Sequence, residues 1–536
     1  MRVVTDTLTQ RPCALIALAI LVACALALTA PRPAAASDSQ LSLVLDDNAF
    51  IYGFDNQRDA ALGEIKAFGA DGVRVTVSWA FLTGNLKHRP PRLRGRRAER
   101  PSSYSRLLWD RFDRLLVGAQ QRGLLVLFNV TGPGPMWANA PTNSPIDRQF
   151  WKPSAAGFGQ FVKAVATRYS GSYRDENDGR RILPRASFWS IWNEPNQPAG
   201  IAPQVEYDKR VRHNVPFAPT RYRELYYAAT SALRATGHAS DVVMMGETAP
   251  LGNTTPGRRI HLWPKLFLRE MFCIGANGAR YHGLEAKVRH CDELKRHGPF
   301  LVNAFAHHPY SQKNPPTHRD AGRDSINMAN IGELPVLLDH LAQKTGLIKR
   351  GLPVALTEIG WQTLPPDPVD GVSLARQAAY MNVADHMAYE NPRIFAQTQF
   401  LLSDVAPRRQ YRVHDPLRWS TWQSGLLFRD GKPKPALYSF LMPIDVRRGG
   451  AAAGGGVTLR VWGQVRAAAY GATETVQLQF RPAGSKLYDT VGAPVQVTNP
   501  MGFYETTLMG RSPGSYRALW DVAGAQLSSR EVSVSP

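Results

Sequence analysis

Two glutamates in this 536-residue chain each stand at the end of a short apolar run. Glu194 follows residues 188–192 in the stretch FWSIWNEPN, and Glu358 follows residues 353–357 in PVALTEIGW. Each run is typical of a buried strand, and a proline directly after Glu194 cannot continue a central strand. Two facing carboxyl groups suit glycosidic bond cleavage, because one protonates the leaving oxygen while the other stabilises or attacks the anomeric carbon.

The elements that must position these glutamates alternate between short apolar runs and amphipathic helical patterns, from about residue 50 to residue 445. Strands are predicted at 50–54, 72–78, 124–130, 188–192, 242–246, 301–306, 354–357 and 394–402. Helical patterns lie between them, for example at 105–122, 154–169, 220–236 and 374–389. Eight such units favour a closed (β/α)8 TIM barrel, whose mouth would bring Glu194 and Glu358 face to face.

The composition changes near Arg447, where helical patterns end. Residues 448–456 are rich in glycine and alanine and are predicted to form a flexible linker. Short alternating runs at 457–465, 474–481, 494–498 and 515–520 then predict a small, immunoglobulin-like β-sandwich over residues 457–536. The sequence therefore predicts a catalytic barrel at 37–447 and a module that either binds glycan or buttresses the barrel. A structural role is favoured, because the module shows no evident row of exposed aromatic residues.

The N-terminal 36 residues have the pattern of a secretory signal peptide. Arg2 and Arg11 precede an apolar run at 14–30, and three alanines at 34–36 form a small-residue cleavage site. We therefore expect the protein to be secreted, with a mature chain that starts at Ser37.

A lipoprotein anchor is the alternative reading of the same segment, because residues 21–24 (LVAC) resemble a processing box that would leave Cys24 acylated. The apolar run continues beyond Cys24, where a processing site should become polar, which favours simple export. No other run reaches about 18 apolar residues, the length that a membrane span needs.

Only Cys273 and Cys291 remain after the predicted cleavage. Two cysteines close together in an exported chain most simply form one disulfide. The alternative is a zinc site with His282 and His290, although this spacing differs from that of the usual paired ligands.

The formal net charge of +21 favours anionic partners, such as an acidic polymer or a cell surface. Residues 87–100 (KHRPPRLRGRRAER) hold seven Lys or Arg against one Glu, within a long segment, 81–103, that follows the second strand. This segment and another at 250–299 are expected at the catalytic rim. The basic segment is interpreted either as a solvated, partly disordered insertion or as a surface that attracts an acidic polymer. A nucleic-acid partner is disfavoured, since the exported chain shows no recognition helix.

Four motifs together resemble the retaining glycoside hydrolases of clan A, and the chain is most similar to family 39 and family 5 enzymes over residues 48–445. WNEPN implies Glu194 as acid/base and Asn193 as a contact to the sugar 2-hydroxyl. TEIGW implies Glu358 as nucleophile. Arg74 matches the arginine that holds the nucleophile ionised, and His308-Pro309-Tyr310 matches the element whose tyrosine hydrogen-bonds it.

The resemblance also implies how the two carboxyl groups divide the work. Arg74 and Tyr310 are expected to lower the pKa of Glu358, so that it stays anionic. Its negative charge favours a protonated Glu194, which becomes a base once the glycosyl-enzyme has formed. His307 is expected to be structural.

Aromatic side chains are the expected walls of a sugar site, and Trp361 and Trp137 are candidate platforms. The chain departs from the clan at strand eight, where many members place a tryptophan. The sequence QTQFLLSD offers Phe400 or Asp404 there, and Trp419 or Trp422 is the candidate replacement.

The sequence thus predicts an exported retaining glycosidase that acts on a β-linked polysaccharide or glycoconjugate, with neither a metal nor an organic cofactor. A transglycosylase of the same fold is one alternative, because a sugar can replace water as the acceptor. A non-catalytic carbohydrate-binding barrel is another, although the two intact glutamates argue against it.

Overall fold

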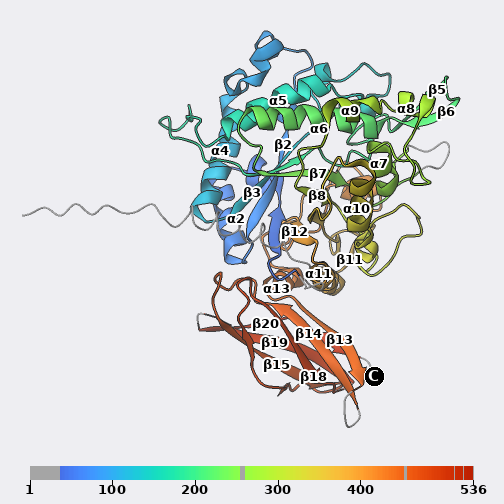
Figure 1. Ribbon diagram of the computed structural model, residues 1–536. Helices are drawn as coiled ribbons and strands as arrows, with labels where there is room; N and C mark the ends of the chain where they lie inside the picture. The colour runs from blue at the N-terminus through green and yellow to red at the C-terminus, as the bar shows by residue number, and fades with distance from the viewer. Residues whose placement is uncertain (1–36, 254–259, 452–455, 512, 523, 535–536) are drawn as a thin grey trace, which may run out of the picture.

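The computed structural model describes residues 37–253, 260–451, 456–511, 513–522 and 524–534. They fold into a large barrel surrounded by helices and a smaller unit of antiparallel strands (Figure 1). The predicted signal peptide, residues 1–36, lies outside the described residues. Among the residues described, no helix combines the length and the apolar character that crossing a membrane requires.

Within the described chain, eight parallel strands close into a barrel in the order β1-β12-β9-β8-β7-β4-β3-β2. The strands are β1 (Leu41–Leu45), β2 (Gly72–Ser78), β3 (Leu125–Thr131), β4 (Phe188–Ile191), β7 (Val242–Thr248), β8 (Ala304–His307), β9 (Val354–Ile359) and β12 (Ile394–Phe400). Closure pairs every strand on both sides, so the barrel has no open edge and its strand ends meet at one mouth. The predicted TIM barrel is confirmed.

The first strand is the one that the sequence analysis misplaced, since it runs Leu41–Leu45 and not over residues 50–54. Asp46 follows it, and its carboxylate accepts hydrogen bonds from the backbone N–H groups of Asn48 and Ala49, each at 3.1 Å. Residues Asn48–Tyr52 then form the short π-helical turn η1. The apolar signal at 50–54 therefore came partly from Phe50 and Ile51, which this turn buries, and partly from the exposed side chains of Tyr52 and Phe54.

Helices follow the strands and form the outer layer of the barrel (Figure 1). The longer ones are α2 (Asp55–Ala67), α4 (Arg106–Gln121), α5 (Ala155–Arg168), α6 (Ala218–Ala235), α10 (Glu333–Thr345) and α11 (Leu374–Tyr389). The shorter ones are α3 (Trp79–Leu82), α7 (Pro264–Met271), α8 (Gly283–Val288), α9 (Asp292–His297), α12 (Pro416–Trp419) and α13 (Pro435–Leu441). Two small two-stranded sheets, β5 (Val205–Asp208) with β6 (His213–Pro216) and β10 (Thr363–Leu364) with β11 (Val372–Ser373), lie in the loops. The four helices whose residue ranges were predicted from the sequence coincide with α4, α5, α6 and α11, and each boundary agrees to within two residues.

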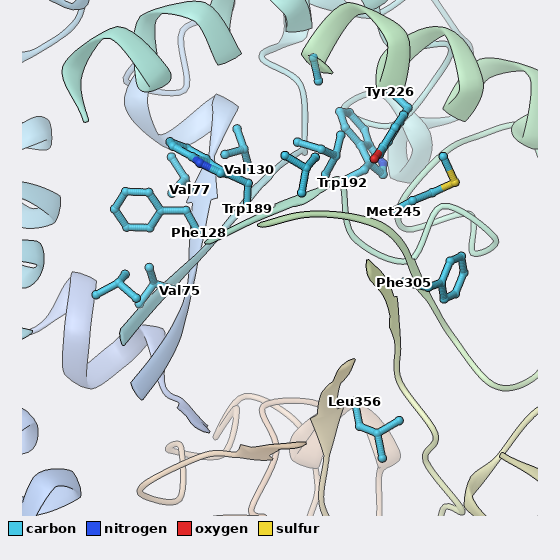
Figure 2. Packing of buried hydrophobic residues seen from close by; sticks show 14 of the residues in the cluster. Val75, Val77, Phe128, Val130, Trp189, Trp192, Tyr226, Met245, Phe305 and Leu356 are labelled. Atoms are coloured by element: carbon cyan, nitrogen blue, oxygen red, sulfur yellow. The ribbon is translucent and has the colours of Figure 1, made fainter. Parts of the chain in front are cut away.

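The largest apolar core lies between the strands and the helical layer. Figure 2 shows Val75 and Val77 of β2 beside Phe128 and Val130 of β3 in this core. Because side chains alternate along a strand, Arg74 belongs to the opposite set and faces the barrel interior. A second cluster fills the interior with Leu43, Leu127, Met244, Ala304, Ala306, Ala355 and Ala396. Arg74 is thus a buried charge set among interior side chains.

The basic segment, residues 87–100, forms defined turns where a partly disordered insertion was one expectation. The turns η3 (Gly95–Glu99) and η4 (Pro101–Ser103) pack beside α5, and η2 (Pro91–Leu93) packs on η3. Leu93 and Ala98 are buried, and the Tyr104 hydroxyl donates to the carbonyl oxygen of Ala98 at 2.8 Å. The segment therefore covers the helical layer, and it supplies none of the described residues that line the cleft at the barrel mouth.

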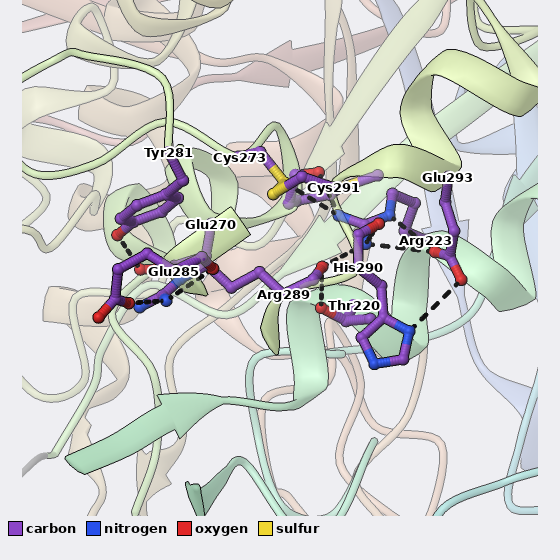
Figure 3. Close-up of a disulfide and its surroundings, with 11 residues drawn as sticks. Thr220, Arg223, Glu270, Cys273, Tyr281, Glu285, Arg289, His290, Cys291 and Glu293 are labelled. Atoms are coloured by element: carbon purple, nitrogen blue, oxygen red, sulfur yellow. Dashed lines mark hydrogen bonds and ion pairs between the residues drawn. A yellow bond between two sulfur atoms is a disulfide. The ribbon is translucent and has the colours of Figure 1, made fainter. Parts of the chain in front are cut away.

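The predicted disulfide is confirmed in the long segment after β7. Cys273 and Cys291 are bonded, with their Cα atoms 5.9 Å apart (Figure 3). The buried Arg223 of α6 donates to the carbonyl oxygens of Met271 and Arg289 at 3.2 and 2.7 Å, which holds both arms of the bridged segment against the helical layer. Since both sulfurs are in the disulfide, the alternative zinc site has no thiolate ligands.

The C-terminal unit is the predicted β-sandwich. One sheet holds β13 (Ile444–Ala451), β14 (Val457–Gln464) and β18 (Phe503–Met509). The other holds β15 (Glu474–Pro482), β16 (Asp489–Thr490), β17 (Val495–Val497), β19 (Gly514–Val522), β20 (Ala525–Ser528) and β21 (Val532–Val534). Their apolar side chains form a core separate from that of the barrel.

The sandwich begins earlier than the predicted boundary at residue 447. Residues 444–447 and 448–451, assigned to the barrel and to a linker, lie together in β13, where Arg447 pairs with Arg460 and Arg448 with Leu459 of β14. The glycine-rich run therefore joins two paired strands of one sheet, and the remainder of the predicted linker, residues 452–455, lies outside the described residues.

The sandwich packs directly on α11. The Nδ1 atom of His386 lies 2.7 Å from the carboxylate of Asp445, and its ring stacks on Trp462 with centroids 4.8 Å apart. Tyr389 joins Trp462 and Phe503 in a small apolar cluster at this contact. The barrel and the sandwich thus share a buried polar and aromatic interface.

Candidate active site

A cleft of about 490 Å³ opens at the C-terminal ends of the barrel strands, where the sequence placed the chemistry. Residues that follow β4, β7 and β8 line it together with residues of β9 and β12, among them Asn193, Glu194, Gln197, Leu251, Tyr310, Lys313, Glu358, Gln362, Phe400, Trp422 and Ser424. Both predicted catalytic glutamates are therefore in one cavity.

Two donors hold the carboxylate of Glu358. Arg74 Nη1 donates to Oε1 at 3.0 Å, and the Tyr310 hydroxyl donates to Oε2 at 3.1 Å. Arg74 Nη2 also donates to Asn193 Oδ1 at 2.9 Å. These contacts fix the plane of the Glu358 carboxylate and agree with those expected for Arg74 and Tyr310.

His308 connects the two glutamates from below the cleft. Its Nδ1 atom lies 3.0 Å from Glu194 Oε1 and 3.6 Å from Glu358 Oε2. One carboxylate oxygen of Glu194 and one of Glu358 lie within 4.8 Å of each other. Carboxyl groups about 5 Å apart are typical of direct attack on the anomeric carbon, whereas activation of a water between them needs roughly 6.5–9.5 Å.

A third glutamate that the sequence analysis did not single out lies beneath this pair. Glu247 of β7 is fully buried, and its Oε2 atom accepts three hydrogen bonds. Arg74 Nη2 donates at 3.1 Å, the Thr357 hydroxyl at 2.7 Å, and His308 Nε2 lies at 2.6 Å. The same signal that marked Glu194 and Glu358 was present, because Glu247 directly follows the apolar run predicted as strand five.

The backbone bends sharply to bring these carboxylates inward. A register shift interrupts the pairing of β7 with β8 between Gly246 and Thr248. Gly246 has φ +117°, and a Cβ atom there would collide with Ala306 and Phe305, so only glycine fits. Glu247 and Glu194 also have positive φ, at 50° and 42°, a region that non-glycine residues rarely adopt and that is found at functional sites. The Glu194 N–H donates to the Glu247 carbonyl at 2.9 Å, which ties the two bends together.

The charges around His308 set its protonation. Burial alone would lower the pKa of His308, but the carboxylates of Glu358, Glu194 and Glu247 raise it to about 10. Burial would likewise raise the pKa of Glu247, yet Arg74 and His308 bring it down to about 2. His308 is therefore a cation and Glu247 an anion at neutral pH.

The expected low pKa of Glu358 is not found. Burial raises the pKa of this carboxyl, and the carboxylates of Glu194 and Glu247 add to the rise, while His308 and Arg74 oppose it. Arg74 and Tyr310 are in the predicted places, but the prediction left out Glu247, which engages both cations from below.

The predicted sugar platforms are not in the cleft wall. Trp361 is 2% exposed, its Nε1 atom donates to the Asn314 carbonyl at 3.0 Å, and it packs on Tyr380 of α11. Trp137 packs edge-on against Trp79 and carries Arg89 over its ring, outside the set of described lining residues. Both therefore serve packing.

Trp422 takes the place that the sequence left open after strand eight. It is 45% exposed, lines the cleft, stacks on Tyr310 at 6.4 Å between centroids and meets Phe400 edge-on at 5.9 Å. Phe400, another candidate, also lines the cleft, whereas Trp419 is buried and the carboxylate of Asp404 pairs with buried Lys434 at 2.7 Å.

Glu194, His308 and Glu358 bring possible metal ligand atoms within 4.8 Å of one another. Both ring nitrogens of His308, however, face carboxylate oxygens, Nδ1 that of Glu194 and Nε2 that of Glu247. A ring that donates from both nitrogens has no lone pair for a metal, so this donor set does not fit one.

Comparison with known proteins gives matches among solved structures only: no family model matches the chain, and no curated protein sequence matches it. A family 39 glycoside hydrolase from the gut symbiont Bacteroides cellulosilyticus WH2 is 12% identical over 89% of this chain and 83% of its own, with a TM-score of 0.45. GH5_18 from Streptomyces cattleya, solved with GlcNAc, is 14% identical over 74% and 79%, with a TM-score of 0.43. A family 1 β-glucosidase from Thermotoga maritima is 12% identical over 73% and 92%, with a TM-score of 0.43. Families 39 and 5, which the motifs resemble, are among these; the identities are low, so the function is inferred from the site.

Proposed function

We propose that this protein is a retaining glycoside hydrolase that cleaves O-glycosidic bonds of a β-linked polysaccharide or glycoconjugate by double displacement. The proposal rests on one observation, the pair of strand-end glutamates whose carboxylate oxygens lie within 4.8 Å of each other in the cleft. Such a pair can protonate a leaving oxygen and attack the anomeric carbon without a cofactor.

In the first step a carboxylate oxygen of Glu358 bonds to the anomeric carbon while the bond from that carbon to the leaving oxygen breaks. Glu194 gives its proton to the leaving oxygen. In the second step Glu194 takes a proton from water, the water oxygen bonds to the anomeric carbon, and the bond to Glu358 breaks. Two inversions leave the anomeric configuration unchanged, and a sugar hydroxyl in place of water would give transglycosylation.

Substrate-binding roles follow from the cleft wall. Asn193 lines the cleft and is held by Arg74, which suits the contact to a sugar 2-hydroxyl that the resemblance implies. Trp422 presents an exposed indole face on which a sugar ring can stack. Arg74 and His308, both buried, would act on the carboxyl groups and not on the sugar.

The test is release of reducing ends by the purified protein, expressed from Ser37, on a panel of neutral and acidic β-linked polysaccharides. Glu358→Ala is the blank and should lose at least about 10⁴-fold in turnover, as removal of a catalytic nucleophile does. Its thermal unfolding should stay cooperative.

Turnover retained by Glu358→Ala would refute the nucleophile assignment. Polysaccharide binding without turnover by the unsubstituted protein, over a broad panel, would favour the carbohydrate-binding alternative. Sugar transfer exceeding hydrolysis at moderate acceptor concentration would identify a transglycosylase.

We further propose that the substrate is acidic. Arg94, Arg96, Arg97 and Arg100 are exposed, and within the described chain none has a carboxylate partner within 4.0 Å. The acid of this segment, Glu99, already pairs with Lys163 at 2.7 Å. Uncompensated guanidinium groups on a fixed frame raise the local concentration of a polyanion, and salt screens the effect.

Replacement of these four arginines by serine should raise KM several-fold for an acidic polysaccharide at low salt and leave KM for a neutral one unchanged. Equal KM values for the variant and the parent, at every salt concentration, would remove the basic segment from substrate capture. Tighter binding to duplex DNA than to the acidic polysaccharide would redirect the assignment to nucleic acid.

Export remains part of the proposal. The signal-peptide pattern of residues 1–36 and a disulfide, which forms in oxidising compartments, support it. N-terminal sequencing of protein from the culture medium should begin at Ser37, whereas an acylated Cys24 in the membrane fraction would establish the lipoprotein alternative.

A further inference from the structure

Glu247 has a place in the site that the proposed double displacement does not use. Its side chain is fully buried and is not among the described residues that line the cleft, so it does not contact substrate. Its Oε2 atom nevertheless binds Arg74, the donor to Glu358, and His308, the contact of Glu194. Each cation of the site thus lies between Glu247 and a carboxyl group of the cleft.

The number of charges in the site decides how many protons it holds. Three carboxyl groups, from Glu194, Glu247 and Glu358, face two cations, from Arg74 and His308. A buried group of charges is most stable when the charges balance, and here balance requires one protonated carboxyl group. Glu247 accepts three hydrogen bonds as an anion, so the proton belongs to Glu194 and Glu358.

Without Glu247 the balance would change. Two cations would face only the two cleft carboxyl groups, and charge balance would no longer favour a proton on either of them. Glu194 would then lack the proton that the leaving oxygen needs, although every residue that touches substrate would still be present.

We propose that Glu247 is a positioning residue that binds Arg74 and His308 from below, so that Glu194 and Glu358 hold one proton between them. The inference rests on the proposed glycosidase function and adds a component to it. A retaining site needs one protonated carboxyl group and one carboxylate anion. The carboxylate of Glu247, which lies outside the cleft, keeps the cleft pair in that state.

The charged and titratable groups that interact with Glu247 are Arg74 of β2, Glu358 of β9, Tyr222 of α6, and His307 and His308 at the end of β8. Asp47 and Tyr310 reach this network through Arg74 and Glu358, and Glu194 reaches it through His308. Arg74 and His308 make the direct ionic contacts, so removal of the Glu247 charge is felt first by these two and through them by Glu194 and Glu358.

The experiment compares kcat/KM against pH for the parent and Glu247→Gln, with a poor alkyl leaving group and an activated aryl leaving group. Loss of a negative charge should move the alkaline limb down by about 1 pH unit or more. At pH 7 the loss should be large for the alkyl glycoside and small for the aryl glycoside, should fall on kcat more than on KM, and should recover at lower pH. Glu247→Asp, which keeps the charge, should keep the parental profile.

Glu270→Gln is the matched control, since Glu270 is also buried and pairs with Arg289 at 2.7 Å, in the disulfide region (Figure 3). It should not move the pH profile. A loss in Glu247→Gln that is equal at every pH and for both leaving groups would overturn the inference, because such a loss indicates a purely structural role.

A measurement on the unsubstituted protein covers the case in which Glu247→Gln does not fold. Downfield proton NMR at pH 7 should show two ring N–H signals from His308, identified by their absence in His308→Gln. A single ring N–H signal would mean a neutral imidazole and would overturn the inference. This measurement does not depend on activity, so it separates failure of the inference from failure of the proposed function.

Discussion

Two buried ionic clusters in the barrel unit differ in what surrounds them. In the first, between helices, Arg168 of α5 donates to both oxygens of Asp113 at 2.8 and 2.6 Å and to Glu176 at 3.1 Å, while the Tyr169 hydroxyl donates to Asp113 at 3.0 Å. In the second, at the barrel mouth, Arg74 and His308 are shared among three glutamates. Both contain a fully buried arginine that contacts more than one carboxylate.

The difference lies in geometry and access. The Arg168 cluster makes a two-pronged pair between regular helices and adds no residue to the cleft described above. The cluster at the mouth stands on backbone with positive φ at Glu194 and Glu247, and two of its carboxyl groups open to the cleft. Burial and charge alone therefore do not mark an active site; strand ends, unusual backbone and a cavity do.

Glu194→Ala is the substitution expected to show the largest functional difference between the two clusters. Loss of the general acid should lower kcat/KM by about 10²–10⁴-fold on an alkyl glycoside and far less on an activated aryl glycoside, whose leaving group needs no proton. Thermal unfolding should change little, because the Glu194 side chain is 29% exposed. Equal losses on the two substrates would argue against an acid role.

The converse change is Arg168→Ala in the helical cluster. It leaves Asp113 and Glu176 without their cation and should lower the free energy of unfolding by about 3–5 kcal/mol. The pH profile and leaving-group dependence of the folded variant should match those of the parent. A shifted profile would mean that the two clusters are coupled and would break the comparison.

The disulfide lies outside both clusters and should affect stability only. Cys273→Ser with Cys291→Ser should reduce the free energy of unfolding by about 3 kcal/mol, from the added freedom of the unfolded chain. Chemical denaturation measures this, and kcat below the transition should stay at the parental value. A large loss of kcat would show that the bridged segment shapes the cleft.

His307 and His308 are adjacent at the end of β8, yet only His308 belongs to the ionic cluster at the barrel mouth. His307 contacts Thr248 and the Ile326 carbonyl at 2.8 and 2.9 Å, and burial lowers its pKa to about 3. Because the unfolded chain binds this proton at higher pH, the contribution of neutral His307 is present above about pH 6.5 and is lost as the pH falls towards 3. Between pH 7 and 5 the loss should be about 2 kcal/mol. His307→Gln should flatten this part of the stability curve; an unchanged slope would contradict the assignment.

The smallest effect is expected from Trp422→Ala in the cleft wall. Loss of the stacking face should raise KM by roughly tenfold, with kcat nearly unchanged, because Trp422 touches none of the ionic groups except through Tyr310. Phe400→Leu is a milder companion at the same wall. A fall in kcat without a change in KM would mean that Trp422 positions Tyr310 and not the sugar.

The parts of the site that could be predicted are those in which a strand and its functional residue are contiguous. The apolar runs that precede Glu194 and Glu358 predicted both strands and showed that each glutamate stands at the C-terminal end of its strand. Arg74 lies within another predicted strand. His307 was also assigned correctly to a structural role.

The parts that could not be predicted depend on the path of the backbone between elements. Glu247 carried the same strand-end signal as Glu194 and Glu358, but hydrophobic periodicity does not reveal the extra residue in β7 that turns it towards Arg74 and His308. The loop after β9 turns Trp361 into the helical layer, although its distance from Glu358 in sequence suggested the cleft. Apolar residues of the turn η1 could not be told from a strand in so short a run.

Helix α11 supports the cleft wall at one end and contacts the sandwich at the other. Near its start the Gln377 side chain donates to the carbonyls of Trp361 and Ser424, each at 3.1 Å, and Ser424 lines the cleft. Near its end His386 and Tyr389 are packed against the sandwich. A chain cut before Ile444 would keep every described residue of the cleft wall yet uncover the end of the helix that supports it. We therefore expect that the barrel does not occur without the sandwich, and that the two units are inherited together.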